Sequence, residues 1–226
     1  MDKNIPIITN DSVFTGRIGP FISAHIDVLE AYDKLRPEGH PYEFHLHSRR
    51  VADNAKALAL ALGWSEDEAI SLYWATLAHD FGKMRLPVDL WDSEGKPTPQ
   101  IKAARRSHTL TGFRFIEEEF NDIAHHPFIA FMAEITLRHH EFIDGSGYLG
   151  LKGDEMSLPV RIVSIVDAFD GWSTWRPHFK DRDISPQGVI TRMRTEKAGK
   201  FDEEIMDVFE KLVLESDKLC FPLKAS

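Results

Sequence analysis

The stretch SEDEAISLYWATLAHDFGK, residues 65–83, decides the fold class of this chain. It opens with a capping box, because the Ser65 side chain can accept a hydrogen bond from the Glu68 amide while Glu68 reaches back. Apolar residues at helical spacing then carry the helix to about Phe81. The helix delivers a histidine and an aspartate, His79-Asp80, and neither is buried at low cost unless something charged holds it.

Helical periodicity dominates the rest of the chain, and no run of alternating β-branched residues is long enough to build a sheet. The sequence therefore predicts an all-α protein, a helical bundle with an N-terminal helical extension. We assign residues 1–41 to the extension and residues 42–226 to the main domain. Cap and turn signals place helices from Pro20 to Pro37, from about Tyr42 to Leu62, from Ser65 to about Phe81, from Thr98 through His108, from Pro127 to His140, from Ser157 to about Trp172, and after Ser185 and Phe201.

Composition limits the possible partners of the chain. Its 226 residues suffice for one domain with a sizeable core. A formal net charge of -9 and the lack of a Lys/Arg cluster argue against binding of a DNA or RNA duplex. Cys220 is the only cysteine, so we expect a structural thiol. No stretch approaches the ~20 apolar residues of a membrane span, and no signal-peptide pattern is present, so we expect no membrane partner and a cytoplasmic location.

Histidines and acids recur where a metal site would need them. On a helix, Glu43 and His47 would share one face and grip one ion. Asp80 suits a carboxylate that bridges two metals, and Asp167 lies in an apolar helix where its charge needs a cation or a hydrogen-bond network. Ordinary alternatives are a surface pair, a helix end that favours histidine, and an acid that bonds backbone amides. Together the residues predict a metal centre whose ligands are Glu43, His47, His79, Asp80, His108, His139, His140 and Asp167.

The charge balance of this set favours phosphoester hydrolysis. Its three carboxylates carry three negative charges, and its five imidazoles bind metals as neutral ligands. Two divalent ions would leave one net positive charge, which a bridging hydroxide would cancel. A third ion would keep the pocket positive and able to attract phosphates. Because such a centre supplies hydroxide at neutral pH and holds a phosphoryl oxygen, we predict metal-assisted phosphoester hydrolysis.

With these positions in view, the chain resembles the HD-GYP subgroup of the HD phosphohydrolase superfamily, from about Glu43 to Phe209. All of the ligands named above match positions where that family places its metal ligands. The stretches that carry the resemblance are His47-Ser48, Arg50-Val51, His79-Asp80-Phe81-Gly82-Lys83, His108 with Gly112, His139-His140-Glu141, Asp144-Gly145-Ser146-Gly147-Tyr148, Gly150-Leu151, Arg161-Ile162 and Asp167-Ala168-Phe169-Asp170.

The resemblance implies an HD-domain bundle that hydrolyses cyclic di-GMP, a bacterial second messenger, or a related cyclic dinucleotide, with two or three iron or manganese ions. The product would be the linear dinucleotide, and GMP stays open as a further product. Lys83 matches a lysine that the family places near the scissile phosphate, so Lys83 and Asp80 are assigned to catalysis. Lys83, Tyr148 and Arg176 are expected to contact the substrate. Regulation would come through the N-terminal helix, a protein partner or substrate supply.

Two departures from the family pattern concern the substrate. The name-giving Gly-Tyr-Pro reads Gly147-Tyr148-Leu149, and Thr109 follows His108 where proline is usual. Loss of the proline frees a backbone dihedral in the loop that forms a wall of the site. Two alternatives therefore stay open: an HD phosphohydrolase that acts on another nucleotide or phosphoester, and a non-catalytic sensor of cyclic dinucleotides.

Overall fold

The computed structural model of the chain describes residues 5–37, 40, 42–92, 97–175, 181–215 and 219–221. Within these residues every named element is helical, and Asp144 and Lys152 pair in an isolated antiparallel bridge. The predicted all-α class is therefore confirmed. No helix among the described residues has both the length and the apolar character needed to cross a bilayer.

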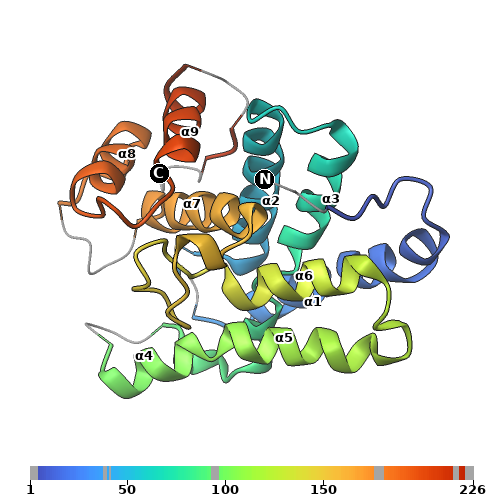
Figure 1. Cartoon of the computed structure of the whole chain (residues 1–226). Coiled ribbons are helices and arrows are strands. Elements are labelled where there is room, and N and C mark those ends of the chain that lie inside the picture. The colour runs from blue at the N-terminus through green and yellow to red at the C-terminus, as the bar shows by residue number, and fades with distance from the viewer. Residues whose placement is uncertain are drawn as a thin grey trace.

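Figure 1 shows the order and arrangement of the helices. The element η1 is a π-helix and the other η elements are short 3-10 helices. In chain order the elements are η1 (Phe14–Ile18), α1 (Gly19–Asp33), α2 (Phe44–Ala61), α3 (Glu66–Leu77), η2 (Phe81–Arg85), η3 (Val88–Leu90), α4 (Pro99–Arg106), α5 (His108–Glu119), η4 (Asn121–Ile123), α6 (Pro127–Arg138), η5 (Gly153–Glu155), α7 (Leu158–Ser173), α8 (Pro186–Thr195) and α9 (Glu203–Glu215).

Local sequence signals set most helix ends. The Ser65 hydroxyl accepts from the Glu68 amide at 3.2 Å, and the Glu68 carboxylate accepts from the Ser65 amide at 2.8 Å, which forms the predicted capping box. Gly63 follows α2 with a φ of 81°, a conformation that costs other residues more than glycine. Thr98 and Ser185 cap α4 and α8 through their side chains, as their positions before a proline predict.

The helices that begin after Ser65 and after Thr98 both end earlier than predicted. The helix expected to reach Phe81 ends at Leu77. The backbone continues as a turn, which contains His79-Asp80, and then as the 3-10 helix η2. The single helix expected from Thr98 through His108 is broken at Ser107. The Ser107 hydroxyl donates back to a carbonyl of the preceding turn, at 2.7 Å, and such bonds bend helices.

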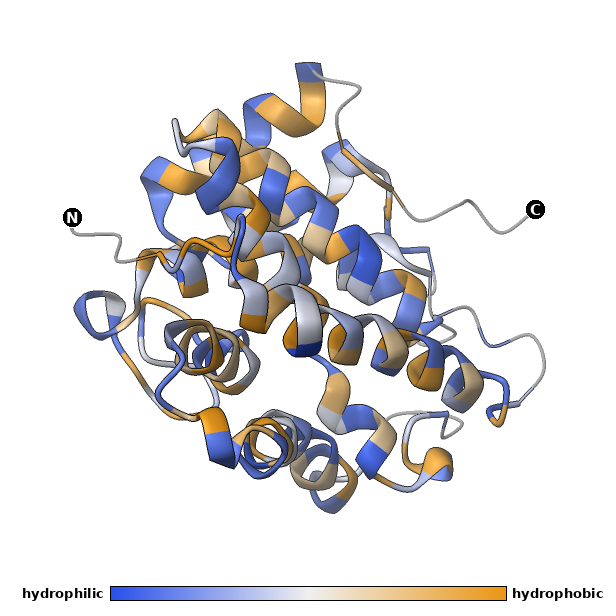
Figure 2. Cartoon of the chain, turned by 90° about the vertical axis from the view of Figure 1, so that its right-hand side faces the viewer, coloured by the Kyte–Doolittle hydropathy of each residue, from blue (hydrophilic) through white to orange (hydrophobic). Residues whose placement is uncertain are grey.

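The main core lies between α2, α3, α6 and α7, and Ile18 of η1 packs onto it together with Ile22 and Ile26 of α1. Figure 2 shows hydrophilic and hydrophobic residues alternating along the helices, as expected where each helix buries one face. A second, smaller cluster joins the end of α1 to the start of α2. The division of the chain at residue 41 stays a prediction.

Candidate metal centre

The structure brings seven of the eight predicted ligands together where α2, α5, α6, α7 and the turn after α3 meet. Their ligand atoms form three overlapping groups, and within each group the atoms lie within 4.8 Å of one another. We call the first group, His47, His79 and Asp167, the His47 subsite. We call the second, His108, His139 and His140, the His108 subsite. The third group is His79, Asp80 and His139.

Asp80 lies between the two subsites and faces both. Its Oδ2 atom is 3.4 Å from the Nε2 atom of His47 and 3.4 Å from that of His79. Its Oδ1 atom is 3.2 Å from Nε2 of His108 and 3.7 Å from Nε2 of His139. Each carboxylate oxygen thus serves one subsite, which is the arrangement that a carboxylate bridging two ions requires.

Asp167 spans the centre from the opposite side. Its Oδ1 atom lies 3.1 Å from His47 Nε2 and 3.7 Å from His79 Nε2, while its Oδ2 atom lies 3.3 Å from His140 Nδ1. The α7 helix that carries Asp167 is otherwise almost entirely buried along this stretch. The sequence expectation that this buried charge needs a partner is met by three imidazoles.

The electrostatic environment of the centre favours the binding of cations. Burial disfavours the charge on Asp80, but Lys83 and the neighbouring imidazoles outweigh it and hold the pKa of this carboxyl well below its usual range. Burial also opposes protonation of His79, yet Asp80 and Asp167 raise its pKa to about 10. Burial lowers the pKa of His140 to about 3, although 25% of its side chain stays exposed. His140 is therefore a neutral ligand at pH 7.

Several atoms of the centre have donor or acceptor capacity that the protein itself does not satisfy. The buried Oδ1 atom of Asp80 has no well-aligned hydrogen bond within the described residues. The Nε2 atoms of His79 and His47 face each other at 3.3 Å, as do those of His108 and His139. Facing nitrogens and an unpaired carboxylate oxygen suit a shared cation, and mixed imidazole and carboxylate donors suit divalent transition metals. The residues present therefore fit divalent metal ions.

Glu43 is the predicted ligand that the structure does not bring to the centre. It is the N-cap residue of α2, with φ and ψ of -92° and 122°, so it precedes the helical turn that would have aligned it with His47. Its side chain is exposed and belongs to none of the three groups, while its carbonyl accepts the His47 amide at 3.0 Å. The four-residue spacing places two side chains on one face only when both residues are helical.

Lys83 lies beside Asp80, and aromatic rings surround it. Its ammonium donates to Asp80 Oδ2, and it lies 4.5 Å from the ring centre of Phe44, 5.5 Å from that of Tyr42 and 5.7 Å from that of Trp91. Rings at these distances attract a cation while they exclude water. The fixed charge of Lys83 is therefore held next to the bridging carboxylate.

Tyr148 covers the His108 subsite. Its ring centre lies 4.7 Å from that of His140 and 6.4 Å from that of His108, and the Arg106 guanidinium lies 4.9 Å above it. Burial raises the pKa of its hydroxyl to about 12, so this group stays protonated at neutral pH. The third predicted substrate contact, Arg176, lies outside the described residues.

Glu141 is a supporting residue to which the sequence analysis gave no role. It is fully buried, and its two carboxylate oxygens accept from the amides of Leu149 at 2.7 Å and Leu151 at 2.9 Å. A side chain at Gly147 would meet the Glu141 carboxylate at 2.8 Å, so only glycine fits there. Glu141 thus holds the loop that carries Tyr148. A charged residue after a helix, followed by a glycine-rich loop, was the available signal.

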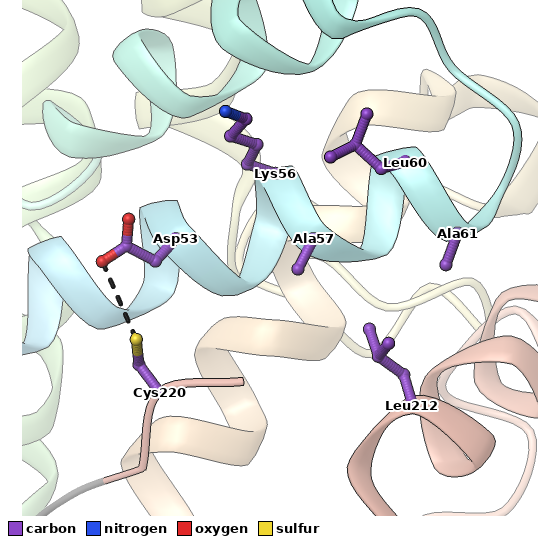
Figure 3. Close-up of a pocket in the computed structure, with 7 residues that line it drawn as sticks. All are labelled: Asp53, Lys56, Ala57, Leu60, Ala61, Leu212 and Cys220. Atoms are coloured by element: carbon purple, nitrogen blue, oxygen red, sulfur yellow. Dashed lines mark hydrogen bonds between the residues drawn. The ribbon is translucent and has the colours of Figure 1, made fainter. Parts of the chain in front are cut away.

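A surface cavity of about 510 Å³ between α2 and α9 lies apart from this chemistry (Figure 3). Asp53 and Cys220 line it, with the thiol 3.9 Å from the carboxylate. Burial raises the pKa of the Cys220 thiol, and the nearby charge of Asp53 adds to this effect. A thiol in this environment is a poor nucleophile at neutral pH. Cys220 is exposed, and its structural role stays a prediction.

Comparisons with known proteins point to the same chemistry. The model of the HD domain family matches residues 38–205. A cyclic di-GMP phosphodiesterase of Thermotoga maritima is 32% identical over 188 residues, which cover 82% of this chain and 49% of that protein. A 3'3'-cGAMP-specific phosphodiesterase of Vibrio cholerae is 30% identical over 164 residues, which cover 72% of this chain and 36% of that protein. The chain thus spans about half or less of the length of these relatives.

Among solved structures, an HDG"Y"P protein from Bdellovibrio bacteriovorus matches with a TM-score of 0.62 and 20% sequence identity. The match covers 86% of this chain and 60% of that one. At this identity the likeness concerns the fold, which it confirms as an HD-domain helical bundle.

Proposed function

The chain belongs to the HD domain family, and from this premise we propose that it is a metal-dependent phosphodiesterase that hydrolyses a cyclic dinucleotide. The observation that carries the proposal is the position of Asp80, with one carboxylate oxygen toward each of two histidine-rich subsites and Lys83 on the same carboxylate. Two subsites about one carboxylate are typical of centres that displace an oxygen at phosphorus in line.

The two subsites, joined by Asp80, would hold the ions, and Glu43 remains a proposed additional ligand. Ions bound there would lower the pKa of water to supply a nucleophile and would neutralise charge on the phosphoryl oxygens. Lys83 would place its ammonium against the same phosphate, where it stabilises charge that develops in the transition state. Iron or manganese, as two or three ions, fits the mixed imidazole and carboxylate ligands.

Tyr148 would form the wall against which the nucleotide lies. Tyr148 is 36% exposed beside His140, so one face of its ring would pack against a base or ribose next to the scissile phosphate. The curated relatives include enzymes named for cyclic di-GMP and for 3'3'-cGAMP, so both are candidate substrates. We keep Arg176 as a proposed substrate contact and hydrolysis of another phosphoester as the alternative, because Leu149 replaces the family's proline.

The test is an anaerobic reconstitution with Fe²⁺ or Mn²⁺, followed by incubation with cyclic di-GMP, 3'3'-cGAMP, cyclic di-AMP and bis(p-nitrophenyl) phosphate. Chromatography of the products should show a linear dinucleotide. Asp80→Asn should abolish the product, whereas Asp53→Asn, in the cavity between α2 and α9, should not. Metal-loaded protein that cleaves none of the three cyclic dinucleotides would refute the proposal. Tight binding without product would favour the sensor.

A further inference from the structure

Three buried imidazoles of the centre are oriented by neutral peptide carbonyls. The Nδ1 atoms lie 2.7 Å from Thr76 O for His79, 2.6 Å from Arg105 O for His108 and 3.0 Å from Thr136 O for His139. In each case the carbonyl belongs to the residue three positions earlier. In a neutral imidazole, donation from Nδ1–H to a carbonyl leaves the lone pair on Nε2, directed at the centre.

His47 is oriented by a charged group instead. Its Nδ1 atom lies 2.6 Å from Asp170 Oδ2, and the Asp170 side chain is fully buried. Arg50 holds this carboxylate with two hydrogen bonds, from Nε to Oδ1 at 2.6 Å and from Nη2 to Oδ2 at 3.0 Å. The contacts with His47 and Arg50 thus fix both oxygens of the Asp170 carboxylate.

The spacing of these residues explains why the contact forms. Arg50 follows His47 by one turn of α2, and Asp170 follows Asp167 by one turn of α7. The crossing of α2 and α7 therefore places two pairs opposite each other, with the metal-facing pair His47 and Asp167 at 3.1 Å and the supporting pair Arg50 and Asp170 behind it.

We propose that Asp170, fixed by Arg50, is a positioning residue for the His47 subsite alone and sets its metal affinity independently of the His108 subsite. A carboxylate partner fixes the Nδ1–H tautomer and makes Nε2 a stronger donor than a carbonyl partner does. The inference rests on the proposed metal site but not on the identity of the substrate.

Asp170→Asn tests the proposal because the amide removes the charge and can present its NH₂ group to Nδ1, which selects the wrong tautomer. Mn²⁺ is titrated anaerobically by calorimetry, and bound metal is counted after gel filtration. Wild type should bind one ion at each of the two subsites. The variant should keep one at the wild-type affinity and bind the other about 10- to 100-fold more weakly. Equal loss of both ions, or loss of neither, would overturn the proposal.

A double-mutant cycle shows whether the effect passes through His47. In a His47→Gln background, Asp170→Asn should weaken Mn²⁺ binding no further. Additive losses would overturn the proposal. Arg50→Lys keeps the positive charge but loses the pair of hydrogen bonds to Asp170, so it should weaken binding of the same ion less than Asp170→Asn does. This variant also serves if Asp170→Asn does not fold.

The chain contains a matched control. Asp33 is a buried aspartate that binds Arg36 at 2.9 Å and His45 Nδ1 at 2.8 Å, and His45 belongs to none of the metal-ligating groups. Asp33→Asn should bind both ions as wild type does, and loss of an ion there would contradict a specific role for Asp170. Wild type that binds two ions yet cleaves no dinucleotide would refute the proposed function and leave this inference standing.

Discussion

The buried carboxylate of Glu141 offers a direct test of how the Tyr148 loop is held. We consider Glu141→Gln. The glutamine keeps one oxygen, which still accepts from one loop amide, but as a neutral group it makes a weaker bond, a loss of about 1 kcal/mol. Its NH₂ group would face the other amide, and that partly buried N–H would lose its partner at a cost of about 2 kcal/mol. Together the two changes should lower the local stability of the loop by about 3 kcal/mol.

Hydrogen exchange measures this loss at the two amides concerned. Since every 1.4 kcal/mol is a factor of ten, the exchange of the Leu149 and Leu151 amides should accelerate about 100-fold in the folded protein. Glu134→Gln, on α6, is the matched control. Its carboxylate bonds Arg138 one turn away and is partly exposed, so the substitution should cost at most about 0.5 kcal/mol.

Unchanged exchange at both amides of Glu141→Gln would refute the reasoning, because the two hydrogen bonds would then contribute nothing to holding the loop. Acceleration of the same size in Glu134→Gln would refute it as well, because the effect would then be a general loss of stability.

Three further outcomes follow from the geometry. Gly82→Ala should destabilise the protein by about 3 kcal/mol in thermal denaturation, because the added methyl group would overlap the backbone carbonyl of His108. Gly16→Ala is the control: its methyl group would meet nothing within 4 Å, so this variant should be neutral or slightly stabilising. His79, with a pKa of about 10, is protonated in the metal-free protein at pH 7.5, so Mn²⁺ binding should release about one proton from it, measured by calorimetry in buffers of different ionisation enthalpy. The stability that this raised pKa gives the metal-free protein is fully present below pH 6.5, the usual pKa of histidine, and is lost as the pH rises through about 10, whereas Mn²⁺ affinity rises over that range. Tyr148→Ala should raise KM for the cyclic dinucleotide about 10-fold and change kcat less, and an unchanged KM would show that the ring does not contact the substrate.

Local sequence signals made the helices predictable. Contacts between helices that are distant in the sequence could not be predicted in the same way. The capping box at Ser65 and the prolines after Thr98 and Ser185 act within one turn, so their positions in the sequence determine the helix starts. The buried acid Asp167 was identifiable because its neighbours along α7 are apolar.

The position of Glu43 and the role of Asp170 could not be read in the same way. Whether the Glu43 side chain lies on the same face as His47 depends on whether α2 begins before or after Glu43. Helix boundaries are the least certain part of a prediction from sequence. The partners of Asp170 are His47 and Arg50, which lie on a helix more than 100 positions earlier in the chain. The hydrophobic periodicity of a sequence does not show where two helices cross.

Charge explains how an acidic protein could take the proposed anionic substrate at this centre. The chain carries a net charge of -9, and a cyclic dinucleotide carries two negative charges. Without ions, the carboxylates of Asp80 and Asp167 are balanced by Lys83 and by protonated His79, so the pocket offers no net attraction. Two divalent ions, with the proton of His79 displaced, would leave three net positive charges in a site with little access to water, where charges interact strongly. Metal loading would therefore govern the affinity for substrate as well as the chemistry, and KM should fall with metal occupancy.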